Sequence, residues 1–210
     1  GINDAPALAQ ADIGIAMGSG AGATRAVAQI VLLDNAFSVM PSVVAEGRRV
    51  LGNIERVADL FLTKSFYAMV VSITTVALTL PFPFLNRHLT LVTAFTIGIP
   101  SFFLALMPNT ERFRPGFFRR VVVFAIPAGV ICAASAYATY GIVLATGNDT
   151  SMARASASYT LFVVAWWVLV QVARPWTPLR ILICVAMVVG FSGVVLIPFL
   201  NRRFALDAGA

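Results

Sequence analysis

The chain has 210 residues, of which 59% are hydrophobic and 11% are charged. Soluble globular proteins are about 45–50% apolar and about 25% charged, so this composition excludes a secreted disulfide scaffold, a disordered tail and a soluble enzyme acting alone. The net charge of +6 would suggest nucleic acid as the partner of a soluble protein. In a membrane protein the positions of the charges matter more than their sum, so we expect the lipid bilayer as the partner and no nucleic acid.

The first 37 residues are rich in Ala and Gly and differ in kind from the rest. Two short β-like runs, 13–17 and 30–33, flank a helical stretch at 23–29. Strand, Gly-rich turn, helix and strand at this spacing are typical of one unit of a parallel α/β sheet. Such a segment is too short to bury its own core, so we expect it to complete a larger domain.

A charged connector helix is expected at 38–59, and the transmembrane domain at 60–200, followed by a tail at 201–210. A membrane-spanning helix needs about 20 apolar residues. Five apolar segments fall within or near that length. They are 60–80, 89–107, 119–145, 157–173 and 179–200. The predicted fold class is therefore a mostly α membrane protein, a five-helix bundle preceded by an α/β piece.

The basic residues predict an orientation for this bundle. If the α/β piece is cytoplasmic, most arginines fall in segments on the inside, as the positive-inside rule expects. We therefore expect a multi-pass protein of the plasma membrane with a cytoplasmic N-terminal region. Arg202 and Arg203 fit this orientation poorly, because five spans place them outside. His88 is expected in an outside loop, without partners at metal-binding spacing.

The most informative stretch consists of two runs, Gly1-Ile2-Asn3-Asp4-Ala5-Pro6-Ala7-Leu8 and Ala11-Asp12-Ile13-Gly14-Ile15-Ala16-Met17-Gly18. Taken alone, Asn-Asp followed by Pro indicates a turn that starts a helix. The whole stretch closely resembles the end of the phosphorylation domain of P-type ATPases. Their signature reads Gly-Asp-Gly-x-Asn-Asp-x-Pro-Ala-Leu and continues into Ala-Asp-Ile-Gly-Ile-Ala-Met-Gly. The resemblance implies that residues 1–37 are the C-terminal end of this HAD-like domain.

The resemblance also implies a chemistry. These pumps transfer the γ-phosphoryl group of ATP to an aspartate with Mg²⁺, and positioning with charge neutralisation provides most of the catalysis. Asn3 would hydrogen-bond near the phosphate, and Asp4 would lie beside the Mg²⁺ as a ligand or as an anchor for one. The sequence contains neither the Asp-Lys-Thr-Gly-Thr segment with the phosphorylated aspartate nor a nucleotide-binding domain. We therefore expect the C-terminal part of a pump whose N-terminal part is a necessary partner, because this part alone cannot hydrolyse ATP.

Neutral oxygens are the candidate ligands for a transported cation, because every Asp and Glu lies outside the five apolar segments. Pro100 cannot donate a hydrogen bond to the carbonyl of Thr96, which frees that oxygen. With the hydroxyls of Thr93 and Thr96, the freed carbonyl would form part of an ion cage. The alternative is a proline kink whose backbone groups are satisfied by neighbouring helices.

Comparison with the calcium-type pumps leaves the identity of the transported ion open. Their pattern in this helix is Asn-x-x-Thr-Asp-Gly-x-Pro, in which Thr93 replaces the Asn, Thr96 matches the Thr and Ile97 replaces the Asp. In the first span, Ser65 falls where those pumps have Asn, and Ala68 where they have Glu. Four stretches look most like the actinobacterial E-type cation-transporting ATPases, which favours calcium or another divalent cation. They are Leu62-Thr63-Lys64, Pro81-Phe82-Pro83-Phe84-Leu85, Leu89-Thr90-Leu91-Val92 and Ile97-Gly98-Ile99-Pro100.

Lys64 has two interpretations. A lysine one turn inside a span commonly extends its ammonium group to the interface; alternatively it is a built-in counter-ion that fills the ion site when the cation leaves. Two other classes of protein also remain open at this point. A lipid flippase would share the phosphorylation-domain motif and lack acids in its spans, and a catalytically dead membrane protein could result from gene truncation.

Overall fold

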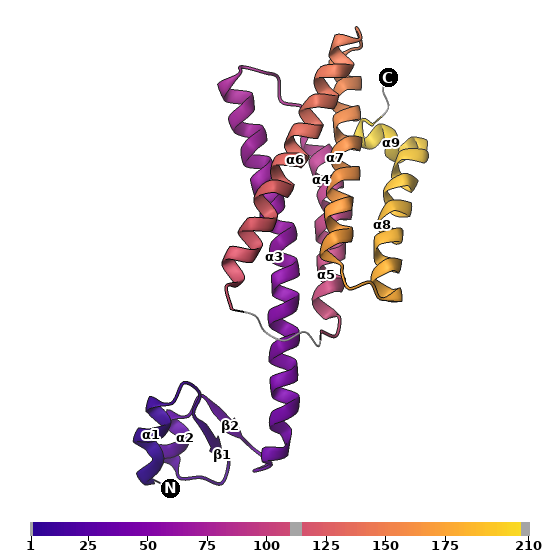
Figure 1. The fold of residues 1–210 in the computed structure, drawn as a ribbon. Helices are drawn as coiled ribbons and strands as arrows, with labels where there is room; N and C mark the ends of the chain where they lie inside the picture. Colours follow the sequence, from indigo (N-terminus) through magenta and orange to yellow (C-terminus); the bar gives the residue numbers. More distant parts are fainter. Residues whose placement is uncertain (1, 110–114, 207–210) are drawn as a thin grey trace. The chain divides into compact units, whose positions relative to one another are not determined.

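The computed structural model describes residues 2–109 and 115–206. Gly1, with which the signature begins, and positions 207–210 of the expected tail lie outside the described residues. The chain divides into two compact units, 1–47 and 48–210 (Figure 1).

The first unit contains a two-stranded parallel sheet with short helices. Strand β1 pairs in register with β2, from Ile15 opposite Ile30 to Met17 opposite Leu32. This confirms the predicted order of strand, helix and strand. Its elements are the 3₁₀ turn η1 (Ile2–Asp4), α1 (Ala5–Gln10), β1 (Ile15–Met17), α2 (Gly22–Val27), β2 (Ile30–Leu32) and the 3₁₀ turn η2 (Phe37–Val39).

A single helix, α3 (Met40–Ala77), covers most of the predicted connector, 38–59, and most of the predicted first span, 60–80. Leu60, Thr63, Tyr67 and Val71 are its buried residues within the predicted span. Their spacing of three and four residues places them on one face of the helix. This face packs into the core of the helical bundle.

The second unit is an antiparallel helical bundle (Figure 1). Five candidate membrane spans are long and apolar enough to cross a bilayer, as predicted: Phe37–Ala77, Asn86–Leu106, Phe117–Ala145, Thr150–Val172 and Pro178–Leu196. After α3 come α4 (Asn86–Thr93), the π-helix η3 (Ala94–Gly98), α5 (Ile99–Leu106), α6 (Phe117–Ala145), α7 (Thr150–Val172), α8 (Pro178–Leu196) and α9 (Pro198–Phe204).

Small side chains allow α6 and α7 to pack closely. Ala133 and Ala136 of α6, with Ala153 and Ala157 of α7, are all buried in the core. Small residues let helix backbones approach each other in a bilayer, where association depends on close packing. The core is completed by aromatic contacts, among them the stacked rings of Phe162 and Phe191, whose centroids lie 3.6 Å apart.

Three details differ from the sequence predictions. Helix α7 begins at Thr150, before the predicted 157, because the Asp149 carboxylate accepts a hydrogen bond from the backbone N–H of Met152 at 2.9 Å and caps a polar first turn. The fifth span ends at Leu196, four residues before the predicted end at 200. His88 lies in α4 and is buried, so its predicted place in an outside loop is wrong.

Candidate functional site

The second candidate span is interrupted at the residues predicted to line the ion path. The π-helix η3 joins α4 to α5, and Pro100 occupies the first turn of α5. The backbone N–H of Ile99 bonds the carbonyl of Ala94, five residues earlier. A π-turn of this kind is rare and frequently marks a functional site. The chain thus changes its hydrogen-bond spacing just before the proline.

Two hydroxyl groups of this segment bond to its own backbone. Thr96, 1% exposed, donates its hydroxyl to the carbonyl of Val92 at 2.8 Å. Ser101 donates its hydroxyl to the carbonyl of Gly98 at 3.1 Å. These contacts hold the hydroxyl oxygens of Thr96 and Ser101 at the interruption. Pro100, which lies between these two residues in the sequence, is also buried.

Helix α3 supplies a further oxygen from the neighbouring span. The Tyr67 hydroxyl lies near the Thr93 side chain, and Tyr67 is buried on the inner face of α3. The structure therefore places Thr93, a predicted site residue, near Tyr67, which the sequence analysis did not predict. Among the described residues, no group of three or more His, Cys, Asp or Glu side chains could hold a metal ion.

Lys64 and Ser65 lie on different sides of α3. Ser65 is exposed and donates its hydroxyl to the carbonyl of Phe61 at 3.1 Å. It lies two residues before Tyr67, about 200° around the helix, and so points away from the Tyr67–Thr93 contact. Lys64 is half-buried and lies about 60° from Tyr67 around the helix. The structure therefore places Thr93 near the inner face of α3 and leaves Ser65 on another side of the helix.

Tyr67 and Ser101 had weak signals in the sequence. Tyr67 follows Thr63 by four residues, and this spacing could have placed both on the inner face of α3. Ser101 directly follows Pro100, where a hydroxyl can reach the backbone of the preceding turn. Neither residue occupies a ligand position in the calcium-pump pattern, so that pattern does not indicate them.

Glycines allow two helices to come very close to this region. A Cβ atom on Gly190 of α8 would lie 2.5 Å from the Phe95 ring of η3. A Cβ atom on Gly129 of α6 would lie 2.6 Å from Phe66 Cβ and 2.9 Å from the Tyr67 backbone nitrogen. All three distances are too short for real contacts. A side chain at position 129 would require the helix backbones to move, whereas one at position 190 would require at least the Phe95 ring to shift.

Buried polar residues connect α3 to the C-terminal ends of other helices. The Asn53 amide donates to the carbonyls of Ala105 at 2.9 Å and Met107 at 2.7 Å. Arg56 donates to the Asn53 side chain at 3.1 Å and to the Arg174 carbonyl at 3.4 Å. The last carbonyls of a helix have no partner within that helix, so these side chains satisfy the ends of α5 and α7.

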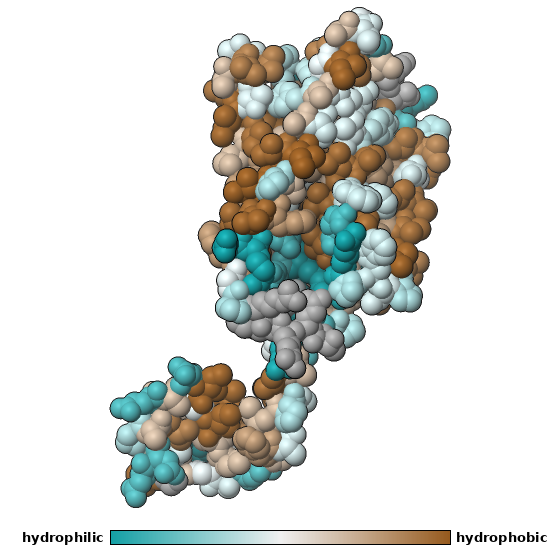
Figure 2. All heavy atoms as spheres, viewed as in Figure 1, coloured by the Kyte–Doolittle hydropathy of each residue, from teal (hydrophilic) through white to brown (hydrophobic). Residues whose placement is uncertain are grey.

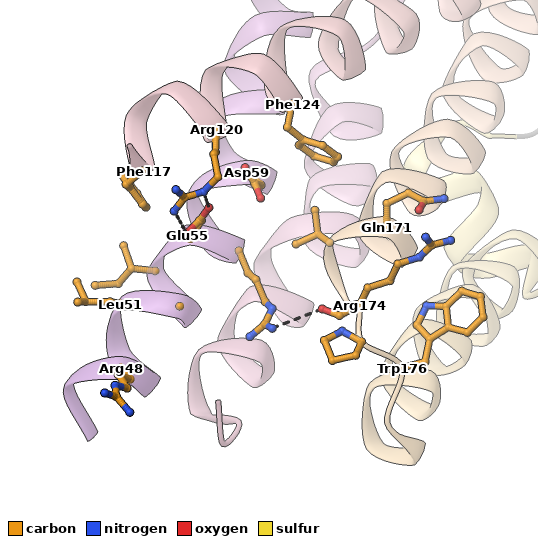
Figure 3. A pocket seen from close by; sticks show the side chains of 15 residues that line it. Arg48, Leu51, Glu55, Asp59, Phe117, Arg120, Phe124, Gln171, Arg174 and Trp176 are labelled. Carbon is orange, nitrogen blue, oxygen red and sulfur yellow. Dashed lines mark hydrogen bonds and ion pairs between the residues drawn. The ribbon is translucent and has the colours of Figure 1, made fainter. Parts of the chain in front are cut away.

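A cavity of about 1160 Å³ opens at this end of the second unit (Figure 3). Arg120 of α6 donates to both carboxylate oxygens of Glu55 in α3, at 2.7 and 2.8 Å. Asp59 lies one turn further along α3 and lines the same cavity. Figure 2 shows hydrophilic residues gathered at this end of the unit, next to a largely hydrophobic surface. The wall therefore mixes acidic, basic and apolar groups.

Asn3 and Asp4 occupy an exposed position in the first unit. Both lie in η1, directly before α1, whose first turn contains Pro6. Proline has no backbone N–H group, but the N–H groups in the first turn of a helix have no partner within the helix, so no helical hydrogen bond is lost at Pro6. The turn thus presents one amide and one carboxylate side by side at the surface of this unit.

The chain is homologous to known calcium-transporting ATPases over nearly its whole length. It is 44% identical to calcium-transporting ATPase CtpE of Mycobacterium bovis, over 99% of this chain and 28% of the relative. It is 43% identical to the protein of that name from Mycolicibacterium smegmatis, with the same coverage. A probable cation-transporting ATPase, exp7 of Streptococcus pneumoniae, is 29% identical, again over 99% of this chain and 28% of the relative. No family model matches the chain. The chain thus spans just over a quarter of the length of these relatives.

Proposed function

We propose that this chain is part of a P-type ATPase that moves a divalent cation, with calcium as the first candidate, across the plasma membrane. The observation that carries the proposal is the 44% identity to a calcium-transporting ATPase over 99% of the chain. The five candidate spans supply the membrane part. Residues 1–37 are the end of the phosphorylation domain in this proposal, and 38–59 connect it to the spans.

In this proposal Asn3 and Asp4 contribute to a pocket for Mg²⁺ and phosphate. The carboxylate of Asp4 and the amide oxygen of Asn3 are the hard oxygen ligands that Mg²⁺ prefers, and both residues are exposed, so the residues present fit the ion. Mg²⁺ would neutralise charge on the phosphoryl group supplied by ATP. Asp4 would hold the ion directly or anchor one of its ligands, and Asn3 would donate to the phosphate. The phosphorylated aspartate and the nucleotide site belong to other parts of the longer protein.

The ion path in this proposal follows the interrupted second span. Thr93, Thr96 and the backbone freed at Pro100 offer neutral oxygens, and Tyr67 lies near Thr93 on the neighbouring helix. Calcium takes six to eight oxygen ligands in general, so part of its shell must come from other helices of the pump.

Lys64 and Ser65 have peripheral roles in the same path. The ammonium group of Lys64 would serve as a counter-ion when the cation leaves. Replacing Lys64 by Met tests this role: unchanged calcium transport and unchanged coupling to ATP hydrolysis would exclude it. Ser65 faces away from Thr93 in this conformation, so it would reach the path only after rotation of α3.

Phosphoenzyme formation tests the proposal in the longer protein. With radiolabelled ATP and calcium, Asp4→Asn should lower the phosphorylated fraction by about 10–100-fold, the usual loss when a metal-site anchor is removed. Asp34→Asn, which removes an exposed carboxylate of the same unit, should leave it unchanged. Phosphorylation that is independent of Asp4, or stimulated by lipids and indifferent to calcium, would contradict the proposal, and the second result would favour a flippase.

A further inference from the structure

A hollow of about 570 Å³ lies at the end of the second unit where α8 finishes and α4 begins. It combines positive charge with apolar groups and includes no acid among its lining residues. We call it the arginine hollow; its lining residues are Arg87, Pro198, Phe199, Arg202 and Arg203. It includes the two arginines, Arg202 and Arg203, whose position the positive-inside rule does not explain.

The helix that carries two of these arginines runs at an angle to the spans. After α8 the chain turns at Ile197, and α9 lies across the end of the bundle (Figure 1). Phe204 is partly buried and packs against the core, whereas Phe199 is 76% exposed. A short helix with exposed arginines and an exposed aromatic ring at the end of a membrane bundle has the character of an interfacial helix.

Buried hydrogen bonds hold the end of α9 in place. His88, 1% exposed, places Nε2 3.1 Å from the carbonyl of Ala205, and Nδ1 2.9 Å from the Ser158 hydroxyl. Tyr159 donates its hydroxyl to the carbonyl of Leu206 at 3.0 Å. These contacts join α4, α7 and the end of α9. Because Arg87 directly precedes His88, they also fix Arg87 relative to Arg202 and Arg203.

The three arginines are not neutralised within the described parts of the chain. The salt bridge between Arg120 and Glu55 lies outside the hollow, and none to Arg87, Arg202 or Arg203 is resolved within residues 2–109 and 115–206. Arg87, Arg202 and Arg203 are all exposed. Guanidinium groups match the geometry of phosphate oxygens and form strong charge-assisted hydrogen bonds with them. A ligand that brings negative charge is therefore favoured here.

We propose that the arginine hollow binds the phosphate group of an anionic phospholipid, with the Phe199 ring beside its acyl chains. Two observations favour a lipid over a free anion: the hollow lies at the end of candidate membrane spans, and Phe199 gives it an apolar edge. Basic pockets between membrane helices are suited to lipid headgroups in this way. In the orientation proposed above, the lipid belongs to the outer leaflet, and its charge offsets the unfavourable placement of Arg202 and Arg203.

Native mass spectrometry of the full protein in detergent, titrated with dioleoyl phosphatidylglycerol or dioleoyl phosphatidylcholine, tests this proposal. The wild type should bind phosphatidylglycerol more tightly. The double variant Arg202→Gln/Arg203→Gln should lose about thirtyfold in that affinity, since each basic residue near an anionic surface contributes a factor of about five. The double variant Arg25→Gln/Arg119→Gln, which removes two exposed arginines elsewhere, should bind like the wild type.

Further arms separate the remaining explanations. The double variant Arg202→Lys/Arg203→Lys should keep most of the affinity if charge is decisive. It is used in place of Arg202→Gln/Arg203→Gln if the glutamine variant cannot be purified. Phe199→Ser should weaken phosphatidylglycerol binding. Equal losses of phosphatidylglycerol affinity in the Arg202/Arg203 and Arg25/Arg119 glutamine variants would overturn the proposal. Complete displacement of the lipid by inorganic phosphate would also overturn it, because it would indicate a site for free anions. None of these outcomes affects the proposed pump function.

Discussion

Helix α3 and the span formed by α4, η3 and α5 both contribute to the same core, but they differ in the continuity of their helical backbone. The first is one continuous helix of 38 residues, and the second is divided by a π-helix and a proline. The unbroken helix keeps all its backbone bonds and can transmit a movement along its length, whereas the divided one presents hydroxyl and carbonyl oxygens at the break. In the proposed pump, this difference favours α3 for the transmission of movement and the α4–η3–α5 span for contact with the ion.

The largest expected effect comes from making α3 flexible. Val50 and Ile54 lie in α3 and are exposed, so replacing both by Gly removes little packing but leaves the helix about 1 kcal/mol less stable at each position than replacing both by Ala. In the longer protein we expect ATP hydrolysis to continue while calcium transport per ATP falls towards zero. The matched variant Val50→Ala/Ile54→Ala preserves the helix and should keep transport coupled. Equal coupling in both double variants would show that continuity of α3 is unimportant.

The next effect concerns the packing that keeps α3 in place. Gly129→Ala forces a methyl group against Phe66 and the backbone of Tyr67, and such overpacking typically costs about 1–3 kcal/mol. Gly141→Ala is the control in the same helix, because its Cβ meets nothing within 4 Å. Unfolding in detergent should show a lower midpoint for Gly129→Ala only. Similar midpoints for both variants would contradict the close approach of α6 to α3.

A smaller effect is expected at the interrupted span. Thr96→Val keeps the side-chain shape but removes the buried hydroxyl, and calcium affinity should fall about tenfold, as expected for loss of one contact to a charged group. Thr90→Val is the matched control, since Thr90 makes the same kind of bond, to the Asn86 carbonyl at 3.0 Å, but is exposed. Calcium-dependent ATP hydrolysis in the longer protein measures both affinities. An unchanged affinity in Thr96→Val would remove this hydroxyl from the ion path.

The smallest effect is expected for the ion pair between α3 and α6. Glu55 and Arg120 form two short hydrogen bonds, but their side chains are 28% and 34% exposed, so water screens the attraction and reduces its contribution. A double-mutant cycle with Glu55→Gln and Arg120→Gln should give a coupling free energy below about 1 kcal/mol. A much larger value would mean that this pair, and not the glycine contact, holds α6 against α3.

Hydrophobic pattern was sufficient to predict the helices but not their irregularities. The five spans and the strand–helix–strand order follow from runs of apolar residues and from Gly-rich turns, which depend on local sequence. The π-helix η3 was missed, because its five residues have the same apolar character as an α-helix. The proline at 100 indicated an interruption without indicating its form.

The buried polar contacts were predicted less well than the spans. His88 is followed by apolar residues and preceded by a proline-rich turn, and nothing local shows that Ser158 and Ala205 will meet its ring. Tyr67 and Thr93 are brought together by the packing of two helices. Such pairs depend on contacts between distant segments, which a single sequence does not reveal.

The most direct test measures ATP hydrolysis and calcium movement together in sealed vesicles containing the full protein. We expect calcium to stimulate hydrolysis and to be carried across the membrane while ATP is consumed. We also expect Thr96→Val to need about tenfold more calcium for both processes. Hydrolysis that does not respond to calcium, or calcium movement that does not require ATP, would contradict the assignment of this chain to a calcium-transporting pump.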